Sequence, residues 1–217
     1  MPSFVSGDKK ITLEHYASGK LGLSPAIVLV HGSGGPLRGI DPFARQAAEM
    51  GVHVFVVHYF ERTGHTWVSP GMIQEFFLQW LETLEDAISY IAAQPGVDQQ
   101  RIGLLGFSLG GFLSLALATR DGRIAAVAEL FGGLPEHFTG DAPKLPPVLI
   151  LHGERDTVVP VGEAQRLEAV LRQHRVPFEV KLYPNQGHHF TGIAQLDAMR
   201  RVAMFFRRYL QKTGVSA

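Results

Sequence analysis

Apolar residues along the chain form two patterns, which are short continuous runs and longer stretches in which they recur every three or four positions. A continuous run bounded by turn residues is typical of a strand buried on both faces of a sheet. We predict such strands at residues 26–30, 53–59, 101–105, 124–130, 147–152 and 178–183, and an alternating edge strand at 10–16.

Stretches with helical spacing lie between the predicted strands. Asp41 has the form of an N-cap before a proline, at the start of a helix that ends near Met50. Further helices are expected directly after residue 111 and at 162–174. The remaining two helices are predicted from apolar stripes at helical spacing. The stripe of the first is Ile73, Phe77, Trp80, Leu84, Ala87 and Ile91. The stripe of the last helix, at about 193–212, is Leu196, Met199, Ala203, Phe206 and Leu210.

Strands that alternate with helices throughout the chain predict an α/β fold, with a doubly wound, mainly parallel sheet and helices on both faces. Ligands of such a sheet bind beyond the carboxyl ends of its strands. The 217 residues contain no repeat or linker, so we expect a single domain over residues 1–217.

Composition excludes several classes of function. Twenty basic and 20 acidic residues cancel, so we expect no attraction to nucleic acid or to a membrane surface, and either a monomer or a homodimer. The absence of cysteine excludes disulfides, thiolate catalysis and cysteine-ligated zinc. The first residues resemble no signal peptide and no apolar run has membrane-spanning length, which predicts a cytoplasmic protein.

The clearest chemical motif is Gly106-Phe107-Ser108-Leu109-Gly110-Gly111, between a predicted strand and a predicted helix. G-x-S-x-G in this position has the form of a nucleophile elbow, a sharp turn that lifts a serine hydroxyl above the sheet edge. The turn strains the serine backbone, and side chains at Gly106 and Gly110 would collide with the crossing strand and helix. A plain glycine-rich turn also fits these residues, so Ser108 needs partners from elsewhere.

A second glycine-rich segment, His31-Gly32-Ser33-Gly34-Gly35-Pro36, follows the strand at 26–30. Its glycines allow backbone N–H groups to point at one spot, as an oxyanion hole requires, and the Leu109 N–H would supply the other donor. A phosphate-binding loop is the alternative, but the Gly-Lys-Ser/Thr ending of a Walker loop and the Rossmann spacing are both missing. His31 itself is interpreted as a packed residue at the strand end.

Two later segments offer a carboxylate and a histidine. Asp156, rather than Glu154, has the position of the hydrolase acid, and the loop after the last strand holds His188 and His189, of which one can reach Ser108. The order Ser, Asp, His is that of α/β-hydrolases. No carboxylate spacing beside the histidine pair resembles a metal motif, so we expect neither metal nor cofactor.

On these motifs the chain resembles the dienelactone hydrolase family of α/β-hydrolases over nearly its whole length. The family elbow reads G-x-C-x-G-G, and Ser108 stands in place of its cysteine. The resemblance implies an α/β-hydrolase fold without a large lid domain, which the short connection at 131–145 matches. It also places the acid at Asp156 in His-Gly-x-x-Asp, the base at His188 in Tyr-Pro…Gly-His-x-Phe, and the first oxyanion-hole residue at Ser33.

The same resemblance assigns a substrate-binding role to Arg62. In the family, the arginine of a Tyr-x-x-Arg segment holds a substrate carboxylate, and Tyr59-Phe60-Glu61-Arg62 matches that segment. An ion pair with Glu61 or another surface acid is the alternative. Two departures weaken the case for a dienelactone substrate, because Gly32 and Gly192 stand where the family has a glutamate and a second arginine.

These observations predict a serine hydrolase that cleaves small carboxylic esters or lactones through an acyl-enzyme. Ser108 would attack, His188 would act as base and then acid, Asp156 would orient His188, and the amides of Ser33 and Leu109 would hold the oxyanion. An acyl-CoA thioesterase and a prolyl-oligopeptidase-like peptidase or amidase are the alternatives among enzymes. A non-catalytic, ligand-binding hydrolase fold is less consistent with a complete set of triad residues.

Overall fold

The computed structural model describes residues 1–36 and 39–211. Its strands form one eight-stranded sheet in the order β1-β2-β4-β3-β5-β6-β7-β8. The strands are β1 (Ser3–Ser6), β2 (Lys9–Tyr16), β3 (Ser24–Val30), β4 (His53–Val57), β5 (Val97–Phe107), β6 (Ile124–Leu130), β7 (Val148–Gly153) and β8 (Phe178–Tyr183). The helices are α1 (Asp41–Glu49), α2 (Pro70–Ala92), α3 (Leu109–Arg120), α4 (Gly162–Gln173) and α5 (Gly192–Leu210), with 3-10 helices η1 (Tyr59–Arg62) and η2 (Glu136–Lys144).

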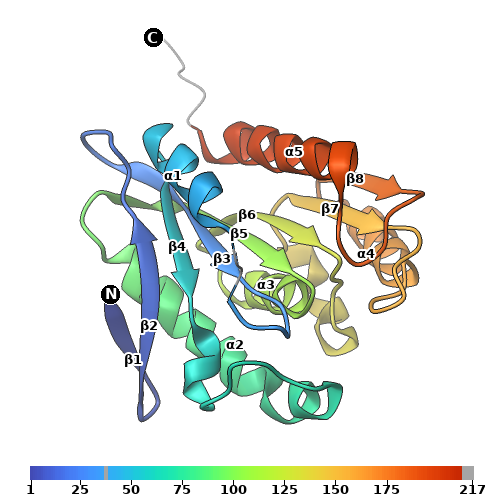
Figure 1. Ribbon diagram of the computed structural model, residues 1–217, viewed down its shortest axis with the longest axis horizontal. Coiled ribbons are helices and arrows are strands. Elements are labelled where there is room, and N and C mark those ends of the chain that lie inside the picture. Colours follow the sequence, from blue (N-terminus) through green and yellow to red (C-terminus); the bar gives the residue numbers. More distant parts are fainter. Residues whose placement is uncertain (37–38, 212–217) are drawn as a thin grey trace.

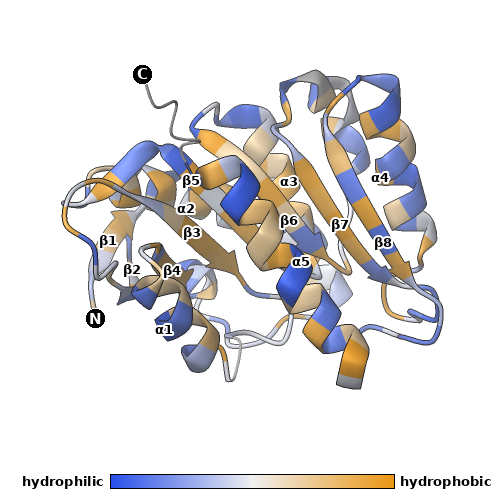
Figure 2. Cartoon of the chain, turned by 90° about the horizontal axis from the view of Figure 1, so that it is seen from above, coloured by the Kyte–Doolittle hydropathy of each residue, from blue (hydrophilic) through white to orange (hydrophobic). Residues whose placement is uncertain are grey.

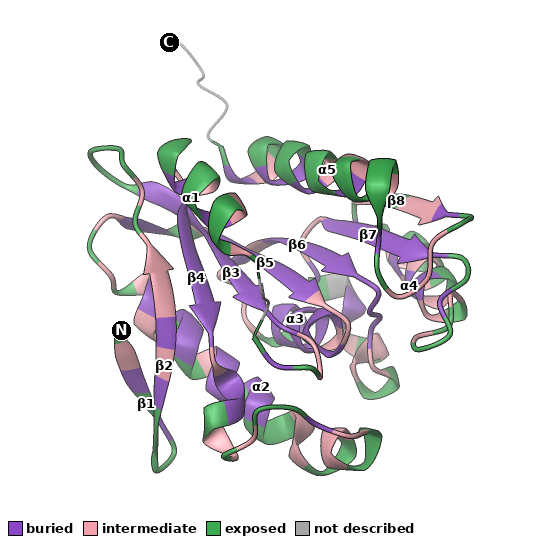
Figure 3. Cartoon of the chain, in the orientation of Figure 1, coloured by how far each residue is buried: buried purple, intermediate pink, exposed green. Residues whose placement is uncertain are grey.

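The strands from β4 to β8 in the sheet order are parallel to one another, and only β1 and β2 run antiparallel to their neighbours. This confirms the predicted α/β fold. Every residue of β3, β4 and β7 is buried, as the continuous apolar runs indicated (Figure 3). Because β3 to β8 are parallel to one another, their carboxyl ends meet at one edge of the sheet.

Helices cover both faces of the sheet (Figure 1). Helices α2, α3 and α4 contribute to one apolar core, which includes Trp80, Leu113 and Leu167. Helices α1 and α5 contribute to the other core, on the opposite face. Seen from above, the apolar strands lie beneath α5, which carries both hydrophilic and hydrophobic residues (Figure 2). None of the described helices is long and apolar enough to cross a membrane.

Two local predictions were wrong, and one strand was missed. The strand β1 was not predicted, because its four residues have no clear apolar pattern. Asp41 is the first residue of α1 and not its N-cap, which is Ile40 and provides no side-chain cap. In α5 the buried residues are Ala198, Val202, Phe205, Phe206 and Leu210. Leu196 and Met199, which were predicted to face inward, are 69% and 41% exposed, respectively.

The start of α3 lies against the backbone of β3 with almost no space between them. A Cβ atom added to Gly110 would lie 2.0 Å from the carbonyl oxygen of Val30 and 2.6 Å from that of His31. At Gly106 an added Cβ would lie 2.3 Å from the carbonyl oxygen of Gly110. Both predicted collisions are therefore present. The contact at Gly110 joins the start of α3 to the backbone of β3, and the contact at Gly106 joins the end of β5 to the start of α3.

We predict that Gly110→Ala lowers the free energy of unfolding by about 3 kcal/mol or more, because the new methyl group meets rigid backbone. Gly71→Ala is the matched control, since Gly71 is also the second residue of its helix and has nothing within 4 Å of an added Cβ. That variant should be unchanged or up to about 1 kcal/mol more stable. Urea unfolding of both variants measures the difference, and equal stabilities would contradict the interpretation of this contact.

Candidate active site

Ser108 lies at the turn between β5 and α3, with backbone angles of φ 53° and ψ −120°. A left-handed φ at a residue with a side chain costs about 1–3 kcal/mol and persists only where the surrounding structure enforces it. Here the Ser108 N–H donates to the carbonyl oxygen of Leu130 at 2.8 Å, and the Gly111 N–H donates to the Ser108 carbonyl at 2.8 Å. The strained turn predicted from G-x-S-x-G is therefore present and is held from both sides.

His188 reaches Ser108 from the loop that follows β8. Its Nε2 lies 3.0 Å from Ser108 Oγ, and its Nδ1 lies 2.7 Å from Asp156 Oδ2. A carboxylate can only accept a hydrogen bond, so Nδ1 carries the proton and Nε2 is free to accept one from the serine hydroxyl. The structure thus joins residues 108, 156 and 188 in one chain of hydrogen bonds.

Asp156 lies in the loop after β7 and its side chain is buried. Burial alone would raise its pKa, but hydrogen bonds from His188 and from the backbone N–H groups of Val158 and Val159 lower the pKa below the usual value. The carboxylate is therefore ionised over the range in which His188 needs a negative partner. Glu154, the alternative acid, is exposed on the same loop.

Two other histidines near the site have structural roles. His152 is fully buried and its Nε2 lies 2.9 Å from the carbonyl oxygen of Val159, which holds the Asp156 loop. His31 is also fully buried, stacks on Tyr59 at 4.2 Å and donates from Nδ1 to the Gly32 carbonyl oxygen. Burial lowers the pKa of both rings, that of His31 to about 4, so both are neutral.

The glycine-rich loop after β3 lies directly against Ser108. A Cβ atom added to Gly32 would lie 3.2 Å from Ser108 Cβ and 3.8 Å from its Oγ. Among the hydrogen bonds of the described residues, none has the Ser33 or the Leu109 N–H as donor. The carbonyl of Ser33 accepts from the Val68 N–H at 2.9 Å, which anchors the loop. The Leu109 amide, next to Ser108 in the chain, and the Ser33 amide, next to Gly32, therefore have no hydrogen-bond partner among the described residues.

Arg62 is not brought to this group of residues. Its guanidinium donates to the Ser6 carbonyl oxygen and to Asp8 Oδ1, both at 3.0 Å, and so braces the hairpin between β1 and β2. Glu61, the expected ion-pair partner, instead accepts from the backbone N–H and the hydroxyl of Thr12. The geometry favours a structural ion pair, with Asp8 as the acid, over the carboxylate-binding role.

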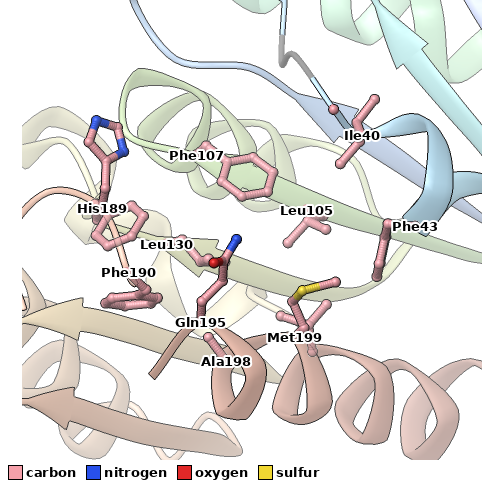
Figure 4. Close-up of a pocket in the computed structure, with 13 residues that line it drawn as sticks. Ile40, Phe43, Leu105, Phe107, Leu130, His189, Phe190, Gln195, Ala198 and Met199 are labelled. Carbon is pink, nitrogen blue, oxygen red and sulfur yellow. The ribbon is translucent and has the colours of Figure 1, made fainter. Parts of the chain in front are cut away.

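The adjacent histidine, His189, lies at the margin of an apolar pocket (Figure 4), and it is His188 that bonds to Ser108 and Asp156. The rings of His188 and His189 lie 5.5 Å apart at an interplanar angle of 66°, so the two side chains diverge. Within the described residues, no group of three or more histidine, aspartate or glutamate side chains is arranged to hold a metal ion. The histidine pair therefore gives no sign of a metal centre there.

Sequence reasoning missed Glu129, a fully buried carboxyl in β6 behind the elbow. Its Oε2 accepts from the Gly132 N–H at 2.7 Å, and its Oε1 is buried with no hydrogen-bond partner. Burial raises its pKa to about 8, partly offset by the Gly132 hydrogen bond. The available signal was a single acidic residue inside the apolar run at 124–130.

The chain is similar in sequence to known proteins. The profile of the dienelactone hydrolase family matches residues 13–209. The carboxymethylenebutenolidase of Rhodococcus opacus is 30% identical over 224 residues, which cover 90% of this chain and 85% of that protein.

Two solved structures share the fold at lower identity. A dienelactone hydrolase-like promiscuous phosphotriesterase from metagenomic libraries superposes with a TM-score of 0.85 at 21% identity, covering 96% of this chain and 97% of that one. The acylaminoacyl peptidase of Pyrococcus horikoshii superposes with a TM-score of 0.82 at 15% identity, covering 99% of this chain and 42% of the larger protein.

We predict that Glu129→Gln stabilises the protein in a pH-dependent manner. The folded-state pKa of Glu129 lies above the unfolded value of 4.5, so the wild-type protein loses stability as the pH rises from about 4.5 to about 8. Glutamine has no charge to bury, so the variant should exceed wild type in free energy of unfolding. The difference should be smallest near pH 4 and grow to about 2–4 kcal/mol above pH 8.

Chemical denaturation of wild type and Glu129→Gln at several pH values measures this difference. Glu75→Gln is the control, because Glu75 is exposed on α2 and should show the same stability as wild type at each pH. A stability difference between Glu129→Gln and wild type that stays constant from pH 4 to pH 9 would show that the pKa of the buried carboxyl is not raised as predicted.

Proposed function

Because this chain belongs to the dienelactone hydrolase family of carboxylic ester hydrolases, we propose that it is a serine esterase that cleaves small carboxylic esters or lactones. Ser108 is the nucleophile, His188 the general base and acid, and Asp156 the residue that orients His188. The observation that carries the proposal is the continuous alignment from Ser108 Oγ through the imidazole to Asp156, with distances of 3.0 Å and 2.7 Å.

The first half of the reaction forms an acyl-enzyme. Ser108 Oγ attacks the carbonyl carbon of the ester while His188 Nε2 takes the hydroxyl proton. The imidazolium that results is stabilised by the ionised Asp156. When the tetrahedral intermediate collapses, the carbon–oxygen bond to the alcohol breaks and His188 returns the proton to the leaving oxygen.

The charge that develops on the carbonyl oxygen needs hydrogen-bond donors that are already in place. The N–H groups of Ser33 and Leu109 fill this role, because each flanks Ser108 and neither is used elsewhere in the described chain. Fixed donors at such a position contribute about 10²–10³ to kcat each in serine hydrolases. Leu109 is also the first residue of α3, where the helix dipole favours negative charge.

The second half of the reaction is hydrolysis of the acyl-enzyme. A water molecule takes the place of the departed alcohol, His188 removes its proton, and the resulting hydroxide attacks the acyl carbon. Collapse of this second intermediate releases the carboxylic acid and returns the proton to Ser108. A serine hydroxyl needs His188 to take its proton as it attacks, whereas the thiol of the family's usual elbow ionises more readily.

We predict that Ser108→Ala lowers kcat for p-nitrophenyl acetate by about 10⁴–10⁶ and leaves the fold intact. A fluorophosphonate probe should add one phosphonyl group to wild type and none to the variant, measured by intact-protein mass spectrometry. Circular dichroism checks the fold. Retention of more than about a tenth of the wild-type rate in Ser108→Ala would remove Ser108 from its assigned role.

The neighbouring histidines provide a second prediction. His188→Ala should cost about as much in kcat as Ser108→Ala, because the members of a triad act as a unit. His189→Ala removes no hydrogen bond to Ser108 or Asp156, so kcat for p-nitrophenyl acetate should stay within about tenfold of wild type. Steady-state kinetics of the two variants decide between the rings, and the opposite ranking would move the base to His189.

A further inference from the structure

An apolar pocket that includes Phe107 lies on the face of the sheet covered by α1 and α5 (Figure 4). Its volume is about 350 Å³, within the usual range of small-molecule sites. Leu105 and Phe107 form its floor, and Ala198 and Met199 of α5 lie across from them. Phe107 directly precedes Ser108, so the floor of the pocket continues into the elbow.

A second wall connects the pocket to His188. The ring of Phe131 lines the pocket and lies 5.3 Å from the His188 ring and 4.4 Å from the Phe190 ring. Phe131 has a left-handed backbone angle of φ 60°, and its N–H donates to the Leu151 carbonyl oxygen at 3.0 Å. Its ring is thus held between the pocket and the imidazole at the edge of the site.

The chemistry of the lining favours an uncharged, apolar occupant. Among the described residues that line the pocket, none is a lysine, arginine, aspartate or glutamate, and the polar side chains are His189 and Gln195. A carboxylate buried there would lose its hydration without gaining a cationic partner. The guanidinium of Arg62 is already engaged by Ser6 and Asp8, and residue 192 is a glycine.

Resting on the proposed function, we infer that this pocket binds the apolar arm of a neutral ester, so that the preferred substrates carry an uncharged hydrocarbon chain and no carboxylate. Each methylene that enters the pocket leaves water for an apolar surface, which is worth about fourfold in kcat/KM. The substrate class is therefore neutral esters with a chain of several carbons, in contrast to the acidic substrates implied by a carboxylate-binding arginine.

The test compares esters of matched leaving group on wild type. From p-nitrophenyl acetate to butanoate and hexanoate, kcat/KM should rise by about tenfold or more in total. The p-nitrophenyl monoester of adipic acid, which has the hexanoate chain with a terminal carboxylate, should be at least about tenfold poorer than the hexanoate ester. A flat series, or preference for the adipate monoester, would overturn the inference.

Three tryptophan variants on α5 locate the effect. Met199→Trp places a larger side chain in the pocket, whereas Met204→Trp alters a methionine that is 57% exposed and lines none of the described pockets. Met199→Trp should lower kcat/KM for hexanoate at least about tenfold more than it lowers kcat/KM for acetate, and Met204→Trp should affect neither. Gln195→Trp is a second pocket variant with the same expected result. Thermal unfolding confirms that all three fold, and equal behaviour of pocket variants and control would overturn the inference.

Ethyl and hexyl acetate distinguish which arm enters. The acyl-chain series requires that the acyl arm enters, so Met199→Trp should impair p-nitrophenyl hexanoate and affect ethyl and hexyl acetate equally; a loss confined to hexyl acetate would overturn the inference. Failure of the proposed function has a separate signature, because wild type would then hydrolyse none of the esters, including acetate. That result would overturn the proposed function and this inference together.

Discussion

The contact between Gly110 and the backbone of β3 is the constraint on which the rest of the site depends. An added methyl group there would lie 2.0 Å from the Val30 carbonyl oxygen, so α3 can begin at this depth only with glycine. This close approach places the first turn of α3 directly beside the loop that leaves β3. As a result Ser108 and Gly32 are neighbours although they come from separate elements. The strain at Ser108, with φ 53°, is maintained by the same contact and by the hydrogen bond to Leu130.

The parallel sheet supplies the remaining partners. Because β5, β7 and β8 end at the same edge, the loops that follow them carry residues 108, 156 and 188 to one place. Three hydrogen bonds to Asp156 overcome the effect of burial and lower its pKa, which fixes the proton of the imidazole on Nδ1. Glu129 shows the opposite outcome, since one hydrogen bond does not compensate for complete burial and the pKa rises to about 8. The number of N–H donors aimed at each buried carboxyl thus decides its charge.

The two faces of the sheet have different roles near the catalytic edge. On the face of α2, α3 and α4, the core is filled by side chains such as Trp80 and Leu113 and supports the elbow from behind. On the face of α1 and α5, packing is incomplete toward the carboxyl ends of the strands, and the pocket beside Phe107 occupies the space. The partial exposure of Met199, which the helical pattern placed inside, follows from that open space.

Sequence alone predicts the order of the α-helices and of the strands other than β1, the elbow, and the sheet-edge positions of residues 108, 156 and 188. These features depend on local periodicity, on glycines that tolerate no Cβ, and on the rule that parallel strands end at one edge. Only the tertiary structure decided the partner of Arg62, the face of α5 that is buried, the burial of Glu129 and the presence of the pocket. Each of these depends on contacts between segments far apart in the chain, such as Arg62 with Asp8. The conformation of a long side chain and the rotation of a helix about its axis depend on such contacts, so a short stretch of sequence does not predict them.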